Sequence, residues 1–421
     1  MNASMPIRAA RFAAVAAITA IFVVMCVWSV RMALADYWFR QETLPGTRQA
    51  LFLEPDSADY YVRLAAIVQE GNSVASTQAL HRAAGLNPWD SQSWIELGLR
   101  AEAAGDLLGA ERNLLRAASV DKQYLPKWSL VNYYFRRGDA EKFWFWAREA
   151  TGMAYGDLTP LFTLCWKVTS DGALIEQRLD IPNANVEANY LTYLAGQNRI
   201  ESMTRAATRL LAWNREADAP VLVAACDRLI ADDRADHAIQ VWNKLADLRR
   251  IPYGVLVPSS GRSLTNGDFK IWPKSEGFDW RLPGAGGVTT LLEEHPAGLR
   301  ISFSGRQPET CDVLTQVLPV METSSYELGF LYRTNGIAAQ TGLGWRITDL
   351  NGSKIFAQGE SLASESEREE KLPFRTPVGI RLARLTLGYQ RAPGTTRIEG
   401  YIVLRELRLT QAHSRIQPLR P

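Results

Sequence analysis

The residues whose types and spacing could support chemistry gather in one short stretch, LTNGDFKIWPKSEGFDWRLP, residues 264–283. Its two carboxylates, Asp268 and Asp279, are the residue type that glycosidases use in pairs. An Asp in an Asn-Gly-Asp turn commonly stabilises that turn with its own side chain, and we assign Asp268 this role. Trp272 stands beside Pro273 in a predicted loop, where its ring could stack on a sugar or on a protein partner.

The rest of the sequence lacks the common catalytic patterns. It has no HExxH, GxSxG or P-loop motif, and no GxGxxG followed by an acidic residue. The four histidines form no metal-spaced pair, and they are His81, His237, His295 and His413. We therefore predict a protein that is not an enzyme and that binds no metal ion and no cofactor.

The cysteines also show no spacing typical of a zinc site. Cys26 lies inside the apolar N-terminal run, and we interpret the other three as small buried hydrophobes, which is the usual behaviour of free cysteine. A disulfide between Cys165 and Cys226 remains an open alternative. The four cysteines are Cys26, Cys165, Cys226 and Cys311.

The region after residue 263 changes from helical periodicity to alternation, which is typical of β-strands. Because residues two apart share one face of a strand, Trp345 and Tyr389 fall on apolar faces and are predicted to be core residues. On the opposite faces lie Arg333, Arg346 and Gln390, which could hydrogen-bond the hydroxyls or carboxylates of an acidic glycan. A face that is merely solvated explains these three residues equally well.

Six or more strands without intervening helices predict a β-sandwich, most simply a jelly roll. The Asn-Gly-Asp-Phe and Gly-Phe-Asp-Trp sequences, the strand YELGFLYRT and the closing strand YIVLRELRL resemble the galactose-binding-type jelly rolls of carbohydrate-binding modules. The resemblance covers roughly residues 264 to 410 and implies a glycan ligand. It does not carry over a calcium site, because the closing strand has Arg405 and only Glu406 where an acidic residue is often found.

The middle of the chain, residues 56–250, is rich in Ala, Leu, Arg and Glu at helical spacing. When the sequence is compared with itself at an offset of 34 residues, Tyr60, Trp94 and Trp128 align with one another, and Gly71 aligns with Gly105. The segment WIELGLRAEAAGDLLGAERNLLRAA resembles a tetratricopeptide repeat (TPR), so we expect a solenoid of about five to six helical pairs. The resemblance implies a protein partner held in a concave groove.

The aromatic run KFWFWARE could contribute to that groove through Phe143, Trp144 and Trp146. Packing between consecutive helical pairs is the alternative, because aromatic residues at helical spacing are commonly buried.

The N-terminal segment Phe12–Val30 is uncharged and long enough to cross a bilayer as one helix. Cleavage as a signal peptide after Ala33-Leu34-Ala35 is the alternative, although the apolar run is longer than a usual signal core. Either interpretation exports the remainder of the chain, to the extracytoplasmic (periplasmic) side of a bacterial inner membrane.

The whole chain, at 421 residues, is too long for one ordinary domain. With 47% hydrophobic residues and a formal charge of +2, it has ample core and no electrostatic reason to bind nucleic acid. We predict the following order: N-terminal tail 1–11, transmembrane helix 12–30, juxtamembrane linker 31–55, TPR-like solenoid 56–250, linker 251–263, β-sandwich 264–411 and C-terminal tail 412–421.

These predictions describe a membrane-anchored envelope scaffold with a protein partner on the solenoid and a glycan on the sandwich. By resemblance, this arrangement suits the assembly or export of surface polysaccharide. Two alternatives remain: a scaffold that binds only proteins, and a polysaccharide-processing enzyme with a carboxylate pair in a cleft.

Overall fold

The computed structural model describes residues 5–153 and 156–412, with side chains from residue 12 onward. The chain forms two compact units, residues 1–183 and residues 184–421. Most of the predicted C-terminal tail lies outside the described residues.

The first unit begins with a long apolar helix, α1 (Met5–Phe39). Its segment Phe12–Phe39 is apolar and long enough to cross a membrane, and none of its most apolar window is buried against the protein. The helix runs past the predicted end at Val30, and α2 (Leu44–Leu53) follows after a short turn. Most of the predicted juxtamembrane linker is therefore helical, and the end of α1 contacts α2, with Ala35 fully buried there.

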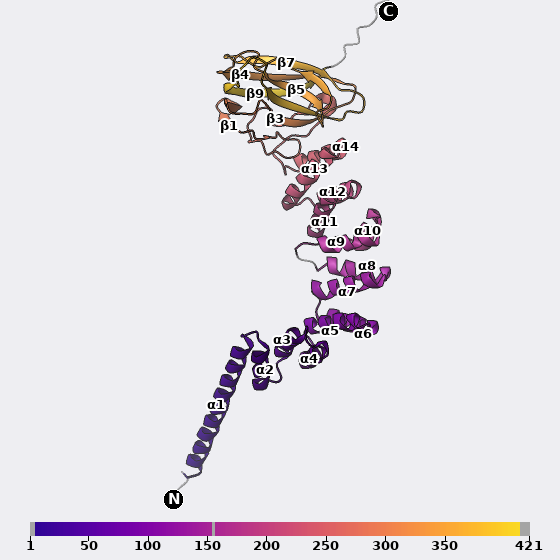
Figure 1. Cartoon of the computed structure of the whole chain (residues 1–421), viewed down its shortest axis with the longest axis vertical. Coiled ribbons are helices and arrows are strands. Elements are labelled where there is room, and N and C mark those ends of the chain that lie inside the picture. Colours follow the sequence, from indigo (N-terminus) through magenta and orange to yellow (C-terminus); the bar gives the residue numbers. More distant parts are fainter. Residues whose placement is uncertain (1–4, 154–155, 413–421) are drawn as a thin grey trace, which may run out of the picture. The chain divides into compact units, whose positions relative to one another are not determined.

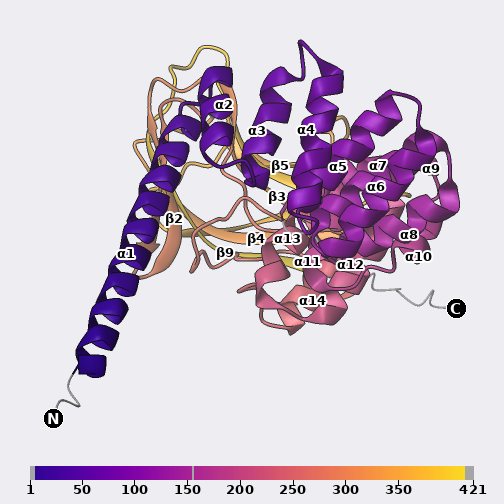
Figure 2. The same cartoon turned by 90° about the horizontal axis from the view of Figure 1, so that it is seen from below.

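The remaining helices of the first unit pack mainly as consecutive pairs, α3 with α4, α5 with α6 and α7 with α8 (Figures 1 and 2). Many begin at an Asn or Asp whose side chain accepts hydrogen bonds from the first-turn amides, as Asp90 does from Gln92 and Ser93. The helices are α3 (Ala58–Val68), α4 (Ser73–Leu86), α5 (Ser91–Ala103), α6 (Leu107–Val120), α7 (Tyr124–Arg137), α8 (Ala140–Thr151), α9 (Thr159–Val168) and α10 (Gly172–Leu179).

The pair α5–α6 shows how the repeat packs. Gly98 on α5 faces Leu114 on α6, and a Cβ on Gly98 would lie only 2.7 Å from Leu114 Cγ. Gly98, Ala110 and Leu114 are all buried. The small residues let the two helices approach, and the leucine fills the space between them.

The second unit opens with two more helical pairs, α11 with α12 and α13 with α14. Each helix contributes large apolar side chains that are fully or almost fully buried, among them Tyr190, Leu210, Leu229 and Leu245. The helices are α11 (Ala184–Gly196), α12 (Ile200–Trp213), the short 3-10 helix η1 (Glu216–Asp218), α13 (Ala219–Ala231) and α14 (Ala235–Asp247).

A two-sheet antiparallel sandwich completes the second unit (Figure 1). One sheet has the order β1-β2-β9-β4-β7 and the other β3-β8-β5-β6. A short 3-10 helix, η2 (Pro258–Ser260), precedes the strands. The strands are β1 (Val288–Glu294), β2 (Ala297–Ser304), β3 (Thr310–Pro319), β4 (Ser325–Asn335), β5 (Leu343–Asp349), β6 (Ile355–Gln358), β7 (Arg368–Arg375), β8 (Leu382–Gln390) and β9 (Glu399–Gln411).

The core lies between the two sheets. Trp345 and Tyr389 are 1% exposed, as strand alternation predicts, and Phe269 and Trp280 from the 264–283 stretch join them there. The Trp280 and Trp345 rings lie 6.2 Å apart between centroids. The predicted fold class, an N-terminal apolar helix followed by a TPR-like solenoid and a jelly-roll-type sandwich, is confirmed.

The last helical pair packs directly on the loops of the sandwich. Trp242 of α14 is fully buried, stacked on Tyr253 and edge-on to Phe278. Gly277 makes room for the indole, because a Cβ at this position would lie 2.1 Å from Trp242 Cζ3. Asp227 of α13 accepts hydrogen bonds from the Gly277 amide (2.8 Å) and from Arg281 Nη2 (2.6 Å).

The segment 251–263, predicted as a linker, is consequently held in place. Asn243 on α14 bonds both backbone groups of Leu256, donating to its carbonyl (2.8 Å) and accepting from its amide (2.7 Å). The compact units also divide after residue 183 and not near residue 251, since the later helical pairs belong with the sandwich.

All four cysteines are free thiols, so the Cys165–Cys226 disulfide is not formed. Both residues are fully buried, and burial raises the pKa of each thiol. This agrees with their interpretation as small core residues.

Candidate functional site

The 264–283 stretch folds into a clamped loop at the start of the sandwich. The Asn266 side chain bonds both backbone groups of Ile271, donating to its carbonyl (2.7 Å) and accepting from its amide (3.3 Å). The buried Trp280 donates its indole N–H to the Asn266 carbonyl (3.1 Å). This loop is thus fixed from both ends, with Phe269 buried in the core and Asp268, Lys270 and Trp272 exposed between the anchors.

Trp272 is one of those side chains. Trp272 is 46% exposed, whereas the adjacent Pro273 is buried. The exposed indole offers an apolar stacking surface on a loop whose backbone is held by Asn266.

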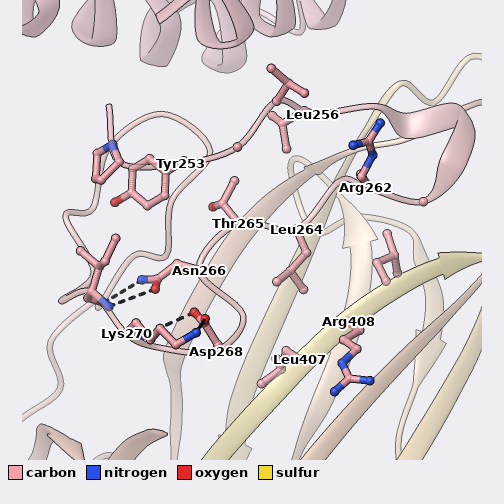
Figure 3. A pocket seen from close by; sticks show the side chains of 16 residues that line it. Tyr253, Leu256, Arg262, Leu264, Thr265, Asn266, Asp268, Lys270, Leu407 and Arg408 are labelled. Atoms are coloured by element: carbon pink, nitrogen blue, oxygen red, sulfur yellow. Dashed lines mark hydrogen bonds and ion pairs between the residues drawn. The ribbon is translucent and has the colours of Figure 1, made fainter. Parts of the chain in front are cut away.

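A hollow of about 670 Å³ lies beside this loop (Figure 3). Its walls come from the segment between α14 and the sandwich, from the clamped loop and from the end of β9. The lining residues are Pro252, Tyr253, Gly254, Val255, Leu256, Gly261, Arg262, Leu264, Thr265, Asn266, Asp268, Lys270, Ile271, Leu407, Arg408 and Leu409.

The charged side chains of this hollow are Arg262, Lys270, Arg408 and Asp268, and all four are exposed. Arg262 and Arg408 lie on one side in Figure 3, with Lys270 and Asp268 on the other. Lys270 pairs with Asp268 at 2.8 Å. Burial acts to raise the pKa of Asp268, but the hydrogen bonds from Lys270 outweigh it, and the pKa is lowered.

The outer face of the four-stranded sheet carries Arg346, and Gln390 lies at the end of the neighbouring strand. Both residues line a small depression of about 60 Å³, whose floor includes the paired glycines Gly344 and Gly388. Arg346 forms an ion pair with Asp312 at 2.9 Å. Gly388 is buried, with the Arg346 guanidinium close to it, and the remaining space is that of a few atoms, not of a sugar ring.

Arg333 lies on the other sheet, on the outer face of β4. Its nearest acidic partner is Glu293 of β1, at 3.7 Å. Glu293 also accepts from Arg300 (2.8 Å) and from Arg405 (2.9 Å). Burial acts to raise the pKa of Glu293, yet these hydrogen bonds prevail and lower it.

Gly298 makes this charged cluster compact. It stands between Glu293 and Arg405 in the sheet, and a Cβ there would lie 2.9 Å from Arg405 Cγ. Arg405 also pairs with Glu367 at 2.7 Å. Most of the arginine charge on this face is therefore already matched by carboxylates of the same protein.

The four residues predicted to contact a glycan thus fall into separate places. The structure brings Arg346 and Gln390 together, but puts Arg333 on the opposite sheet and Trp272 in the clamped loop. Sequence reasoning missed Arg262, Lys270 and Arg408. Arg262 lay in a presumed linker, and only the position of Lys270 within the aromatic stretch could have drawn attention to it.

The aromatic residues predicted for the solenoid groove divide in a similar way. Phe143 and Trp144 are 1% and 5% exposed and pack edge-to-face within the helical core. Their rings are therefore not available to a partner. This agrees with the alternative interpretation, in which these aromatic residues pack between helical pairs. Trp146 is half-buried, and the exposed ring of this run is its neighbour Phe145.

Another exposed aromatic group lies between α4 and α5. Trp89 is 73% exposed, and the Arg116 guanidinium lies 5.9 Å from its ring centroid and 6.0 Å from that of Trp94. The cation orients the exposed indole by a cation–π contact.

The two carboxylates considered for glycosidase chemistry, Asp268 and Asp279, are both engaged by neighbouring groups of the protein. Asp279 is fully buried and accepts from the Tyr253 hydroxyl (2.8 Å) and the Lys274 amide (2.6 Å). A buried carboxylate of this kind cannot reach a substrate. Within residues that the structure describes, no group of three or more His, Cys, Asp or Glu side chains could hold a metal ion.

Comparison of the sequence with models of protein families and with curated proteins gives no match. Among solved structures, yeast Tom70 is similar over 53% of this chain and 52% of its own, with 14% identity and a TM-score of 0.31. A CBM4 structure matches 36% of this chain and 100% of its own, with 10% identity and a TM-score of 0.29. The structure of TmCBM61 in complex with β-1,4-galactotriose matches 35% of this chain and 92% of its own, with 12% identity and a TM-score of 0.23.

Proposed function

We propose that this protein is a non-catalytic, membrane-anchored scaffold that binds a protein through its helical pairs and a glycan through its sandwich. The observation that carries the glycan part is the preformed hollow, with exposed Trp272 on the clamped loop that helps to form it. Preformed concave sites with a few convergent polar groups are the usual form of a small-ligand site.

The protein-binding part is supported by the helical repeats. Stacked helical pairs present an extended surface, and binding hot spots are enriched in Trp and Arg. Trp89 with Arg116 supplies such a pair on the first unit. These two residues replace the buried Phe143 and Trp144 as our candidates for partner contact.

The location that we propose is the extracytoplasmic face of a bacterial inner membrane, with α1 as the anchor. The apolar stretch from Phe12 supports the anchor by its length and composition. A role in the assembly or export of surface polysaccharide would use both binding parts, because it brings a glycan and an envelope protein to one anchored chain.

Glycan binding is tested with the full chain in nanodiscs, by affinity electrophoresis or calorimetry against bacterial surface polysaccharides. We expect Trp272→Ala to weaken binding by about tenfold, since stacking on one aromatic ring contributes roughly 1 to 1.5 kcal/mol. Trp213→Ala is the matched control, because Trp213 is similarly exposed at 49% but lies at the end of α12. Absence of binding to any polysaccharide would leave the scaffold that binds only proteins as the better proposal.

Protein binding is tested by crosslinking and capture from envelope extracts. We expect Trp89→Ala and Arg116→Ala to lose the same partner. Phe52→Ala is the control, since this ring is 80% exposed elsewhere in the first unit. Equal capture by all variants contradicts the assignment of Trp89, and hydrolysis of any polysaccharide contradicts the non-catalytic proposal.

A further inference from the structure

We propose that the hollow beside the clamped loop binds a saccharide that carries carboxylate groups, with Arg262 as the main contact to the carboxylate. This inference rests on the proposed glycan-binding function and specifies its ligand class. It moves the site away from both sheet faces, where sequence alternation placed Arg333, Arg346 and Gln390.

The hollow has fixed walls. Asn243 holds Leu256, Tyr253 donates to the buried Asp279, and Asn266 clamps Ile271. Leu407 of β9 also donates its amide to the Gly267 carbonyl (2.8 Å), which ties the loop to the strand. A ligand therefore meets walls that are already ordered, which lowers the entropic cost of binding.

The charge that lines the hollow is mainly cationic. Leu256, Leu407 and Leu409 contribute little surface, since they are 3%, 3% and 7% exposed, whereas Val255, Leu264 and Ile271 are half-buried and add apolar surface to the walls. The charged lining residues are instead exposed, with Arg262, Lys270 and Arg408 against Asp268 alone. A ligand with negative charge fits this lining better than a neutral one.

Arg262 is the cation most available to such a ligand. Lys270 is engaged by Asp268, and Arg408 by Glu406. Arg262 has only a long hydrogen bond to Ser260 Oγ (3.4 Å), and no ion pair of it occurs among the described residues. A guanidinium can bind a carboxylate through two parallel hydrogen bonds, which gives both strength and orientation.

The aromatic lining and the size of the hollow favour a saccharide over a small inorganic anion. The half-buried Tyr253 contributes an aromatic side chain to the lining. Trp272 is not a lining residue, but it follows the lining residue Ile271 in the chain and is 46% exposed. A volume of about 670 Å³ also far exceeds that of one small anion.

The test compares acidic oligosaccharides with their neutral methyl esters. Oligomers of galacturonic, glucuronic and mannuronic acid, and the ester of each, are titrated into the full chain in zwitterionic nanodiscs. We expect at least one acid to bind about tenfold more tightly than its ester, and to bind less tightly as salt screens the charges.

Variants assign the contact. Arg262→Gln should weaken binding of the acid by about tenfold and leave binding of the ester nearly unchanged, and Arg408→Gln should have a smaller effect in the same direction. Arg306→Gln is the matched control, because Arg306 is an exposed arginine outside the hollow. Circular dichroism verifies that each variant is folded.

Three outcomes overturn the inference and are distinguishable. Equal or tighter binding of the esters refutes charge recognition while the glycan-binding function stands. Loss of binding in Arg333→Gln or Arg346→Gln but not in Arg262→Gln moves the site to a sheet face. No binding of any acid or ester, together with no binding of surface polysaccharides, refutes the proposed function as well.

Discussion

The helical pairs α5–α6 and α13–α14 solve the same packing problem with different partners. In the first, Gly98 on α5 receives Leu114 from the next helix. In the second, Trp242 on α14 is received by Gly277, which lies in a loop of the sandwich. Both contacts put a large side chain against a glycine.

The difference teaches what a repeat pattern can reveal. The Gly98–Leu114 contact lies within one repeat, so the 34-residue period exposes it in the sequence. The Trp242–Gly277 contact joins a helix to a β-domain and belongs to no period. The last helical pair thus has the form of a repeat but also serves as the base on which the sandwich packs.

The largest effect is expected from Trp242→Ala. Removing a fully buried indole leaves a cavity between α14 and the sandwich loops and should cost about 3 to 5 kcal/mol of unfolding free energy. Hydrogen exchange should rise both in α13–α14 and in the loop around Gly277. Trp213→Ala, which removes an exposed indole, should change stability by less than about 0.5 kcal/mol. If hydrogen exchange in the loop around Gly277 stayed unchanged, Trp242 would stabilise only α13 and α14. Its contact with Gly277 would then not be equivalent to the Gly98–Leu114 contact.

Gly98→Val tests the other member of the comparison. Extra atoms would press on Leu114 and should destabilise the chain by about 1 to 3 kcal/mol, measured by urea unfolding. Leu114→Ala in the same chain should recover part of this loss, because it removes the clash. Gly85→Ala on α4 is the control, since a Cβ at this position would meet no neighbouring group within 4 Å and the helix should gain stability. A stable Gly98→Val variant would contradict the proposed close approach.

The ion pair of Asp227 with Arg281 should contribute less than the buried indole. A double-mutant cycle with Asp227→Ala and Arg281→Ala should give a coupling free energy of about 1 kcal/mol. The parallel cycle for Asp236 and Arg381 should give less than about 0.5 kcal/mol, since Asp236 is largely exposed. Equal coupling free energies would show that the lower exposure of the Asp227–Arg281 pair does not make it stronger than the Asp236–Arg381 pair.

The smallest effects concern pH, and they have opposite signs in the two regions. Hydrogen bonds from Lys142 and Tyr134 lower the pKa of Glu111 on α6, so its contribution is present above the ordinary value of 4.5 and is lost as pH falls through the lowered pKa. Burial raises the pKa of Asp227 despite Arg281, so its contribution is complete below the ordinary value of 3.8 and is lost as pH rises through the raised pKa.

Acid unfolding series can detect this contrast. Glu111→Gln should make the loss of stability on acidification shallower, and Asp227→Asn should make it steeper, each by less than about 1 kcal/mol. The same sign for both variants would contradict the contrast between the two carboxylates.

Much of the fold follows from the sequence because its signals are local. The spacing of Trp94, Gly98 and Leu114 predicts helical pairs, and strand alternation correctly assigns Trp345 and Tyr389 to the core. Less of the candidate site follows from it. Alternation tells which residues share a face of one strand, but it does not tell which strands share a sheet.

The sequence by itself determined the element types, the apolar N-terminal helix and the buried face of each strand, because these depend on periods of a few residues. Only the tertiary structure separated Arg333 from Arg346 and Gln390, since strand pairing puts β4 and β5 in different sheets. It alone also joined Arg262, Lys270 and Arg408 around one hollow. Segments distant in sequence meet there because Asn243, Asn266 and the Leu407 backbone hold them by hydrogen bonds that no local pattern encodes.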